Sequence, residues 1–161
     1  MMRITQGDLD DRRVIDLLDL HFNRARTESP AGSFHALDPS GLKSPDICFW
    51  TIWDGESLAG IGALRRLSAD HGEIKAMHVA EAMRGQGAGR ALLGHIIATA
   101  RSLGMSRLSL ETGARPYFLP AQALYRRQGF VECEAFGDYE PDPNSVFMTL
   151  DLGDPGGDLT P

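Results

Sequence analysis

The sequence predicts an α/β protein with a mixed, mostly antiparallel central sheet of six to seven strands flanked by about four helices. Short runs rich in β-branched and aromatic residues alternate with segments of helical periodicity. Turn signals such as Asp54-Gly55 separate neighbouring strand candidates, and single glycines such as Gly104 follow the helical segments. The 161 residues leave room for one domain with a full hydrophobic core.

The first half of the chain contains one clear helix and four strand candidates. Residues 3–6 form a candidate strand, and Asp8 is expected to cap a helix with apolar residues at helical spacing up to Phe22. Ser, Pro and Gly end this periodicity in residues 27–45, where we expect a long connection of functional importance. Three consecutive antiparallel strands are then predicted at residues 47–53, 57–67 and 73–79.

The second half alternates helices and strands. A helix is expected from about Ala88 to Leu103, and a second one from Phe118 to Gln128 with Gly129 at its C-cap. The remaining strand candidates are residues 107–112, 130–136 and 145–152. We therefore expect a single domain over residues 1–152. Residues 153–161, rich in Gly, Pro and Asp, are expected to form a flexible tail.

Composition excludes several classes of protein. The net charge of −6 and the absence of a long basic run argue against a nucleic-acid binder. No apolar stretch approaches the roughly 20 residues of a membrane span, and the N-terminus does not resemble a signal peptide. We interpret Cys48 and Cys133 as buried, reduced thiols of a cytoplasmic protein. The five histidines lack metal-ligand spacing, so no metal site is predicted.

The segment MRGQGAGRALL, residues 83–93, places glycines at alternate positions directly before a helix. The first N–H groups of a helix lack internal partners, and its dipole places partial positive charge there. Glycines let such amides approach a ligand, and Arg84 and Arg90 add charge, so the segment predicts a phosphate or pyrophosphate site. The spacing fits neither a Walker loop nor the dinucleotide G-x-G-x-x-G pattern. A flexible turn before a helix is the alternative.

The segment RGQGAG, residues 84–89, matches the Q/R-x-x-G-x-G/A signature of the GCN5-related N-acetyltransferase (GNAT) family. The preceding EIKAMHV, residues 73–79, resembles that family's central strand. ALYRRQGF, residues 123–130, resembles its later A-x-x-L-Y-x-x-x-G-F block, with Ala121 at the leading alanine. LETG and FGDYEPDPNSVFMTL are similar to a bacterial subgroup of acetyltransferases. The resemblance covers about residues 47–150 and implies the GNAT fold.

The resemblance also implies the acyl donor and its site. Acetyl-CoA would bind with its pyrophosphate on the glycine loop and its pantetheine arm along the central strand. A main-chain N–H near Val79 would then stabilise the charge on the thioester oxygen, which is typically worth about 2.7–4 kcal/mol. The implied cofactor-binding residues are Met77, His78, Val79, Arg84, Gly85, Gln86, Gly87, Ala88, Gly89 and Arg90.

Two side chains are implied for catalysis. Glu73 would take the proton of the acceptor ammonium, directly or through water, and Tyr125 would protonate the departing thiolate. An ordinary strand-end carboxylate and a core tyrosine are the alternatives. His78 is a further candidate for contact with the substrate or for a water relay. Phe118 stands where many members of the family carry a cofactor-contacting asparagine, so that contact is absent or altered.

The sequence thus predicts an acyltransferase that moves the acetyl group of acetyl-CoA directly to a primary amine of a small molecule or a peptide N-terminus. No nucleophile in a suitable setting indicates an acylated enzyme. A transferase of longer acyl chains and a non-catalytic acyl-CoA binding or sensing module are the alternatives. Many relatives are homodimers, and the sequence neither indicates nor excludes a dimer. The acceptor itself is not identified.

Overall fold

The computed structural model describes residues 2–29 and 41–153. Its helices and strands follow the predicted order. In chain order they are β1 (Met2–Gln6), α1 (Arg12–Glu28), β2 (Ile47–Asp54), β3 (Ser57–Arg66), β4 (His71–Val79), α2 (Ala88–Ser102), β5 (Arg107–Gly113), α3 (Leu119–Arg127), β6 (Val131–Cys133) and β7 (Ser145–Asp151). Short 3-10 turns occupy Gly41–Lys43, Glu81–Met83 and Pro116–Phe118.

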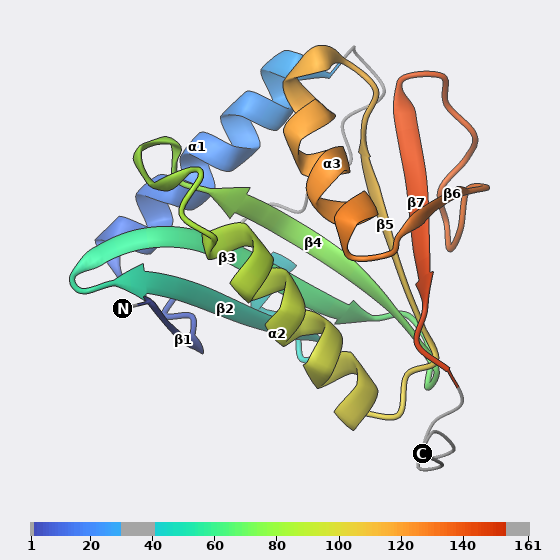
Figure 1. The fold of residues 1–161 in the computed structure, drawn as a ribbon, viewed down its shortest axis with the longest axis horizontal. Coiled ribbons are helices and arrows are strands. Elements are labelled where there is room, and N and C mark those ends of the chain that lie inside the picture. The colour runs from blue at the N-terminus through green and yellow to red at the C-terminus, as the bar shows by residue number, and fades with distance from the viewer. Residues whose placement is uncertain (1, 30–40, 154–161) are drawn as a thin grey trace.

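The strands form one seven-stranded sheet in the order β1-β2-β3-β4-β5-β7-β6 (Figure 1). All neighbouring pairs are antiparallel except β4 and β5, which run parallel. The predicted mixed α/β fold is therefore confirmed. Where about four helices were expected, the described residues contain three α-helices.

Helices cover both faces of the sheet (Figure 1). On one face, α1 packs its buried side chains against Phe49, Trp53 and Ile61 of β2 and β3. On the other face, α2 and α3 form a larger cluster with the sheet, which includes Leu92 and Tyr125. Both helices have the apolar periodicity that buries one stripe against a sheet.

Strands β4 and β5 separate along their length, as Figure 1 shows. They pair only where His71–Glu73 faces Arg107–Ser109. Strand β4 is also irregular on its other side, because Ile61 faces His78 whereas Ala63 faces Lys75. The extra residue bulges at Ala76, which has a φ of 55°, a conformation that side chains other than glycine rarely adopt. The splayed end of β4 therefore carries main-chain groups that β5 does not cover.

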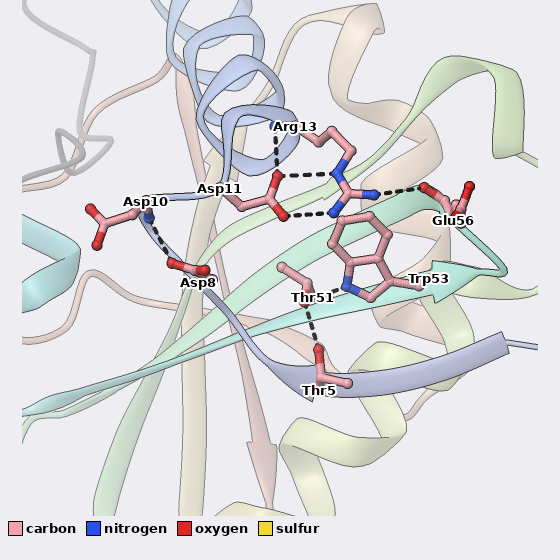
Figure 2. Close-up of polar contacts among 8 residues, drawn as sticks. All are labelled: Thr5, Asp8, Asp10, Asp11, Arg13, Thr51, Trp53 and Glu56. Carbon is pink, nitrogen blue, oxygen red and sulfur yellow. Dashed lines mark hydrogen bonds and ion pairs between the residues drawn. The ribbon is translucent and has the colours of Figure 1, made fainter.

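The start of α1 is held by a compact set of polar contacts (Figure 2). Asp11 is the N-cap and accepts a hydrogen bond from the Arg13 amide. The predicted cap at Asp8 was wrong, because that carboxylate accepts the Asp10 amide in a turn before the helix. The Arg13 guanidinium donates two hydrogen bonds to the Asp11 carboxylate, from Nη2 at 2.7 Å and from Nε at 3.1 Å. Its Cζ lies 4.4 Å from the centroid of the Trp53 ring.

Three other expectations concern the whole chain. Both cysteines are free, as expected, but Cys48 is exposed and Cys133 half-buried, so the prediction of two buried thiols was wrong. On β2 the buried position is occupied by the neighbouring Phe49 instead.

No helix among the described residues has the length and apolar character needed to cross a membrane. The predicted flexible tail lies outside the described residues, apart from Gly153.

Candidate active site

A cavity of about 530 Å³ opens beside the splayed end of β4, which is a typical size for a small-ligand site. Its walls come from the end of α1, from β4, from the loop before α2, from the end of β5 and from α3. Nine of the ten predicted cofactor-binding residues line it: Met77, His78, Val79, Arg84, Gly85, Gly87, Ala88, Gly89 and Arg90. The described residues that line this cavity do not include Gln86, which is exposed.

Glycine is required at the three positions of the loop for two different structural reasons. Gly85 and Gly87 have φ values of 79° and 89°, and a Cβ built on either would meet nothing within 4 Å. Gly87 is also the N-cap of α2, so the loop turns sharply and leaves open space at the helix start. At Gly89 a Cβ would lie 3.1 Å from side-chain atoms of both Leu124 and Val79. That glycine lets α2 pack closely on β4 and α3.

The charge of the cavity suits an anion. Lys75, Arg84, Arg90 and Arg127 line it, whereas Glu111 is the single acidic residue among its described lining residues. The helix N-terminus adds the partial positive charge of its unpaired amides. A ligand with several phosphate charges matches this arrangement, because arginine forks and main-chain amides both bind phosphate oxygens.

The main chain of β4 also faces the cavity. The Ala80 amide donates to the Ala59 carbonyl of β3 at 2.8 Å. Because successive amides of an extended strand point to opposite sides, the Val79 N–H is directed toward the β5 side. There β5 has already separated from β4, so an extended ligand has access to this strand edge.

Tyr125 of α3 lines the same cavity although its side chain is almost fully buried. Its ring packs edge-on against Phe130, with centroids 5.8 Å apart. Burial, and secondarily the charge of Glu111, raise the pKa of the phenol above its ordinary value. The hydroxyl therefore stays protonated at neutral pH, which is the state that a general acid requires.

Glu73 has a different environment from the one expected for a base that meets substrate. It is 1% exposed, and it is absent from the described residues that line the cavity. Its carboxylate accepts a hydrogen bond of 2.5 Å from the Tyr139 hydroxyl and pairs with the Lys75 ammonium at 3.5 Å. Burial, followed by the charge and hydrogen bond of Glu73, raises the pKa of Tyr139. Among these groups Lys75 reaches the cavity, so the role of Glu73 as base stays a prediction that requires an intermediary.

The residues of the cavity wall that sequence reasoning missed include Glu111 and His21. Glu111 lies at the splayed end of β5 and accepts a hydrogen bond from the Ser145 hydroxyl at 2.8 Å. It belongs to the LETG segment, so a carboxylate at a strand end was the available signal. His21 lies one turn after Leu17 on the apolar stripe of α1, and a polar residue in such a stripe was the corresponding signal.

The ring of Phe118 lines the cavity in place of the asparagine common in the family. It packs so closely that a Cβ built on Gly113 would lie 2.1 Å from it. The cavity wall is therefore apolar at this position. Residues 30–40 of the long connection predicted over residues 27–45 lie outside the described residues. Within residues 2–29 and 41–153, no three His, Cys, Asp or Glu side chains gather as a metal site requires.

Comparison with known proteins decides the family. The acetyltransferase (GNAT) family matches residues 13–130. The chain belongs to the GNAT family. The GNAT resemblance of the glycine loop is thereby confirmed, and the protein is an acyltransferase of the class that uses acyl-CoA.

Relatives with this fold cover nearly the whole chain. YsnE of Bacillus subtilis, an uncharacterized N-acetyltransferase, is 46% identical over 151 residues, which are 94% of this chain and all of YsnE. A Klebsiella pneumoniae structure assigned to the acyl-CoA N-acyltransferases is 32% identical with a TM-score of 0.76, covering 95% of this chain and 99% of that one. A B. subtilis acetyltransferase solved with CoA shares the fold at 22% identity and a TM-score of 0.69, with coverages of 94% and 99%.

Proposed function

We propose that this GNAT protein transfers the acetyl group of acetyl-CoA directly to a primary amine of a small molecule or a peptide N-terminus. The observation that carries the proposal is the meeting of three features in one cavity. These are the glycine loop at the start of α2, the uncovered edge of β4 and the buried hydroxyl of Tyr125. Each matches one part of the donor: the phosphates, the amide-containing arm and the sulfur.

The residues present fit the phosphate end of CoA. The loop amides at the α2 N-terminus would donate to the pyrophosphate, while Arg84 and Arg90 supply charge beside them. Open space at Gly85 and Gly87 supports a close approach of main chain and ligand. Arg127 of α3 lines the same cavity and is available for a further phosphate.

Bound acetyl-CoA supplies the acetyl group as an activated thioester. The edge of β4 near Met77 and Val79 would hold the pantetheine arm by main-chain hydrogen bonds. The Val79 N–H would stabilise negative charge on the thioester oxygen, an effect of about 2.7–4 kcal/mol for one donor. Tyr125 would donate its phenolic proton to the departing sulfur, because burial keeps that proton in place at neutral pH.

Glu73 is the base that the sequence proposes. Its buried carboxylate would act on the acceptor through Lys75 or water, because it has no cavity surface of its own. Glu111, the acidic residue of the cavity wall, would attract the ammonium form of the acceptor by its charge.

Binding and turnover test the proposal separately. Calorimetry of the full chain with CoA should detect binding, and CoA release should be stimulated by members of an amine panel. The panel contains benzylamine, ethanolamine, putrescine, lysine, a peptide with a free N-terminus and methoxyamine. Tight CoA binding without acetylation of any member would favour the non-catalytic module. Preference for a longer acyl-CoA would favour the other alternative.

Two matched glycine substitutions test the loop. Gly87→Ala and Gly55→Ala both place a side chain at a left-handed φ, 89° and 61°, with nothing within 4 Å of the new Cβ. Each should cost about 1–2 kcal/mol of stability. Gly55 lies in the turn of the β2–β3 hairpin and is not among the described residues of the cavity wall. Only Gly87→Ala should therefore also weaken CoA binding. Equal CoA affinities of the two variants would contradict the role of the loop.

A further inference from the structure

Two histidine rings meet at the wall of the cavity. His21 comes from α1 and His78 from β4, and both line the cavity. Their Nδ1 atoms lie 3.1 Å apart, and the rings are nearly perpendicular, with centroids separated by 5.2 Å. The geometry is that of a hydrogen bond between the two Nδ1 atoms.

An Nδ1–Nδ1 hydrogen bond restricts where the protons of the pair can be. One ring must carry its proton on Nδ1, and the other must accept with a bare Nδ1. A neutral imidazole has a single ring proton, so the donor ring has a bare Nε2 and the acceptor ring has a protonated one. The contact therefore leaves one of the two rings with an Nε2 that can take up a proton.

The surroundings keep both rings neutral at physiological pH. Burial lowers the pKa of His21 to about 3, helped by His78 and Lys75. Burial likewise lowers the pKa of His78 to about 4, helped by Arg84 of the glycine loop and Arg24 of α1. A neutral pair does not repel an ammonium ion, and negative phosphates bound at Arg84 would offset the cation that depresses the basicity of His78.

The pair has better access to substrate than the buried carboxylate of β4. Glu73 is absent from the described lining of the cavity and is bound by Tyr139 and Lys75. His78 lies beside Val79, whose amide is directed toward the splayed side of β4. A proton acceptor is thus present on the strand that would hold the thioester.

We infer that His78 is the residue that removes a proton from the acceptor ammonium, and that His21 holds His78 in the required tautomer. The inference rests on the proposed acetyl transfer. An N–H bond of the ammonium breaks, its electron pair stays on the amine nitrogen, and a new N–H bond forms at His78 Nε2. The His78 Nδ1–H remains bonded to His21 Nδ1, so the positive charge is shared with the second ring until the proton leaves to water. His78 is then a catalytic residue and His21 a positioning residue.

Nuclear magnetic resonance tests the pair without any acceptor. In the full chain with ¹⁵N-labelled histidine, His78 should show the uncommon Nδ1–H tautomer at neutral pH. The variant His21→Leu should return it to the common Nε2–H tautomer, and His78→Gln identifies its signals. An Nε2–H tautomer of His78 in the parent protein would overturn the inference, as would a tautomer unaffected by His21→Leu.

Kinetics test the catalytic role. With the fastest alkylamine of the panel, His78→Gln should lower kcat by about 10²-fold or more, the usual range for a general base. With methoxyamine, which is largely unprotonated at neutral pH, the loss should shrink to a few-fold. His95→Gln is the matched control, because His95 packs on Trp50 and is not among the described residues of the cavity wall. Equal losses with both amines, or no loss, would overturn the role.

The pH profile separates positioning from folding. A variant without the proton acceptor uses only amine that is already neutral, so its kcat/KM should rise about tenfold per pH unit, whereas the parent profile is flatter. His21→Leu should show this steeper profile, and His21→Gln, which keeps a hydrogen-bond acceptor, should restore part of the parent behaviour. If the parent protein acetylates no amine, both the proposed function and this inference are wrong. If the parent is active and the activity of His78→Gln equals that of the parent, only this inference is wrong.

Discussion

The two ends of α1 carry polar regions that use their charges in opposite ways. At the start of the helix, Arg13 is paired with Asp11, and Trp53 donates its Nε1–H to Thr51 (Figure 2). At the other end, the cavity next to His21 contains Arg84 and Arg90, for whose guanidinium groups the described part of the chain provides no ion pair or hydrogen bond. The polar groups of the first region stabilise the fold, whereas the guanidinium groups of the second are available to bind a ligand.

The comparison separates stabilising charge from functional charge. A second cavity, of about 340 Å³, lies against Arg13 and Trp53, so the presence of a hollow does not distinguish the regions. What distinguishes them is the state of their polar groups. Groups satisfied within the chain gain little from a ligand, whereas amides and guanidinium groups without partners gain new hydrogen bonds. Substitutions should therefore alter stability at one end and binding or catalysis at the other.

The largest effect is expected at Tyr125. Tyr125→Phe removes the hydroxyl and leaves the buried ring against Phe130, so folding and CoA affinity should change little. Loss of the acid should lower kcat by about 10²-fold or more. Tyr117→Phe makes the same change on another cavity residue, one that stacks with Arg24, and should keep most of kcat. Similar kcat values for the two variants would show that the Tyr125 hydroxyl is not the acid.

The next largest effect is expected when arginines are removed from the two polar regions, the one at the start of α1 and the one at the cavity. Arg84→Ala and Arg90→Ala should each weaken CoA binding about tenfold, as expected when a charged hydrogen bond of about 1.4 kcal/mol is lost at an exposed site. Arg13→Ala should leave the affinity unchanged and lower the melting temperature, because it removes the Asp11 pair and the contact with Trp53. Calorimetry and thermal unfolding of the three proteins measure both quantities. A loss of CoA affinity in Arg13→Ala would break the comparison.

The sequence predicted the local features of the cavity and missed the ones that depend on distant contacts. The glycine loop and the strand before it carry their geometry in adjacent residues, so Gly85 and Gly87 could be interpreted directly. The contact of His21 with His78 joins residues 57 positions apart, and no local pattern specifies it. Similarly, the Tyr139 hydroxyl donates a hydrogen bond to the Glu73 carboxylate across 66 positions of the chain.

Backbone irregularity was equally invisible in the sequence. The bulge at Ala76 places a non-glycine residue at positive φ, a strained position that local propensity does not indicate. Tertiary pairing of β3 with β4 on one side, together with separation from β5 on the other, supplies the reason. The N-cap was misassigned because Asp8 and Asp11 are both good caps, and the choice depends on where α1 packs.

The histidine pair should make stability sensitive to moderate acid. The folded-state pKa values of His21 and His78, about 3 and about 4, lie below the ordinary value of 6.5. The unfolded chain therefore binds more protons below pH 6.5, so stability should fall as pH decreases from 6.5 toward these values, on the order of 1 kcal/mol per pH unit. The double variant His21→Gln/His78→Gln should have a flatter profile in urea unfolding. An unchanged slope would mean that the rings are not buried in the neutral form.

The smallest effect on binding, and a clear effect on stability, is expected at Thr51. Thr51 is 1% exposed, and its hydroxyl accepts the Trp53 Nε1–H at 2.8 Å and lies 3.0 Å from the Thr5 hydroxyl. Thr51→Val leaves the indole N–H without its acceptor, which should cost about 1–3 kcal/mol in urea unfolding, whereas Thr51→Ser keeps the oxygen and should cost less. CoA affinity should be the same in both variants and the parent, since the cavity lies at the other end of α1. A change in CoA affinity that follows the loss of stability would mean that the two ends of α1 are coupled. The separation of stabilising from functional polar groups would then be wrong.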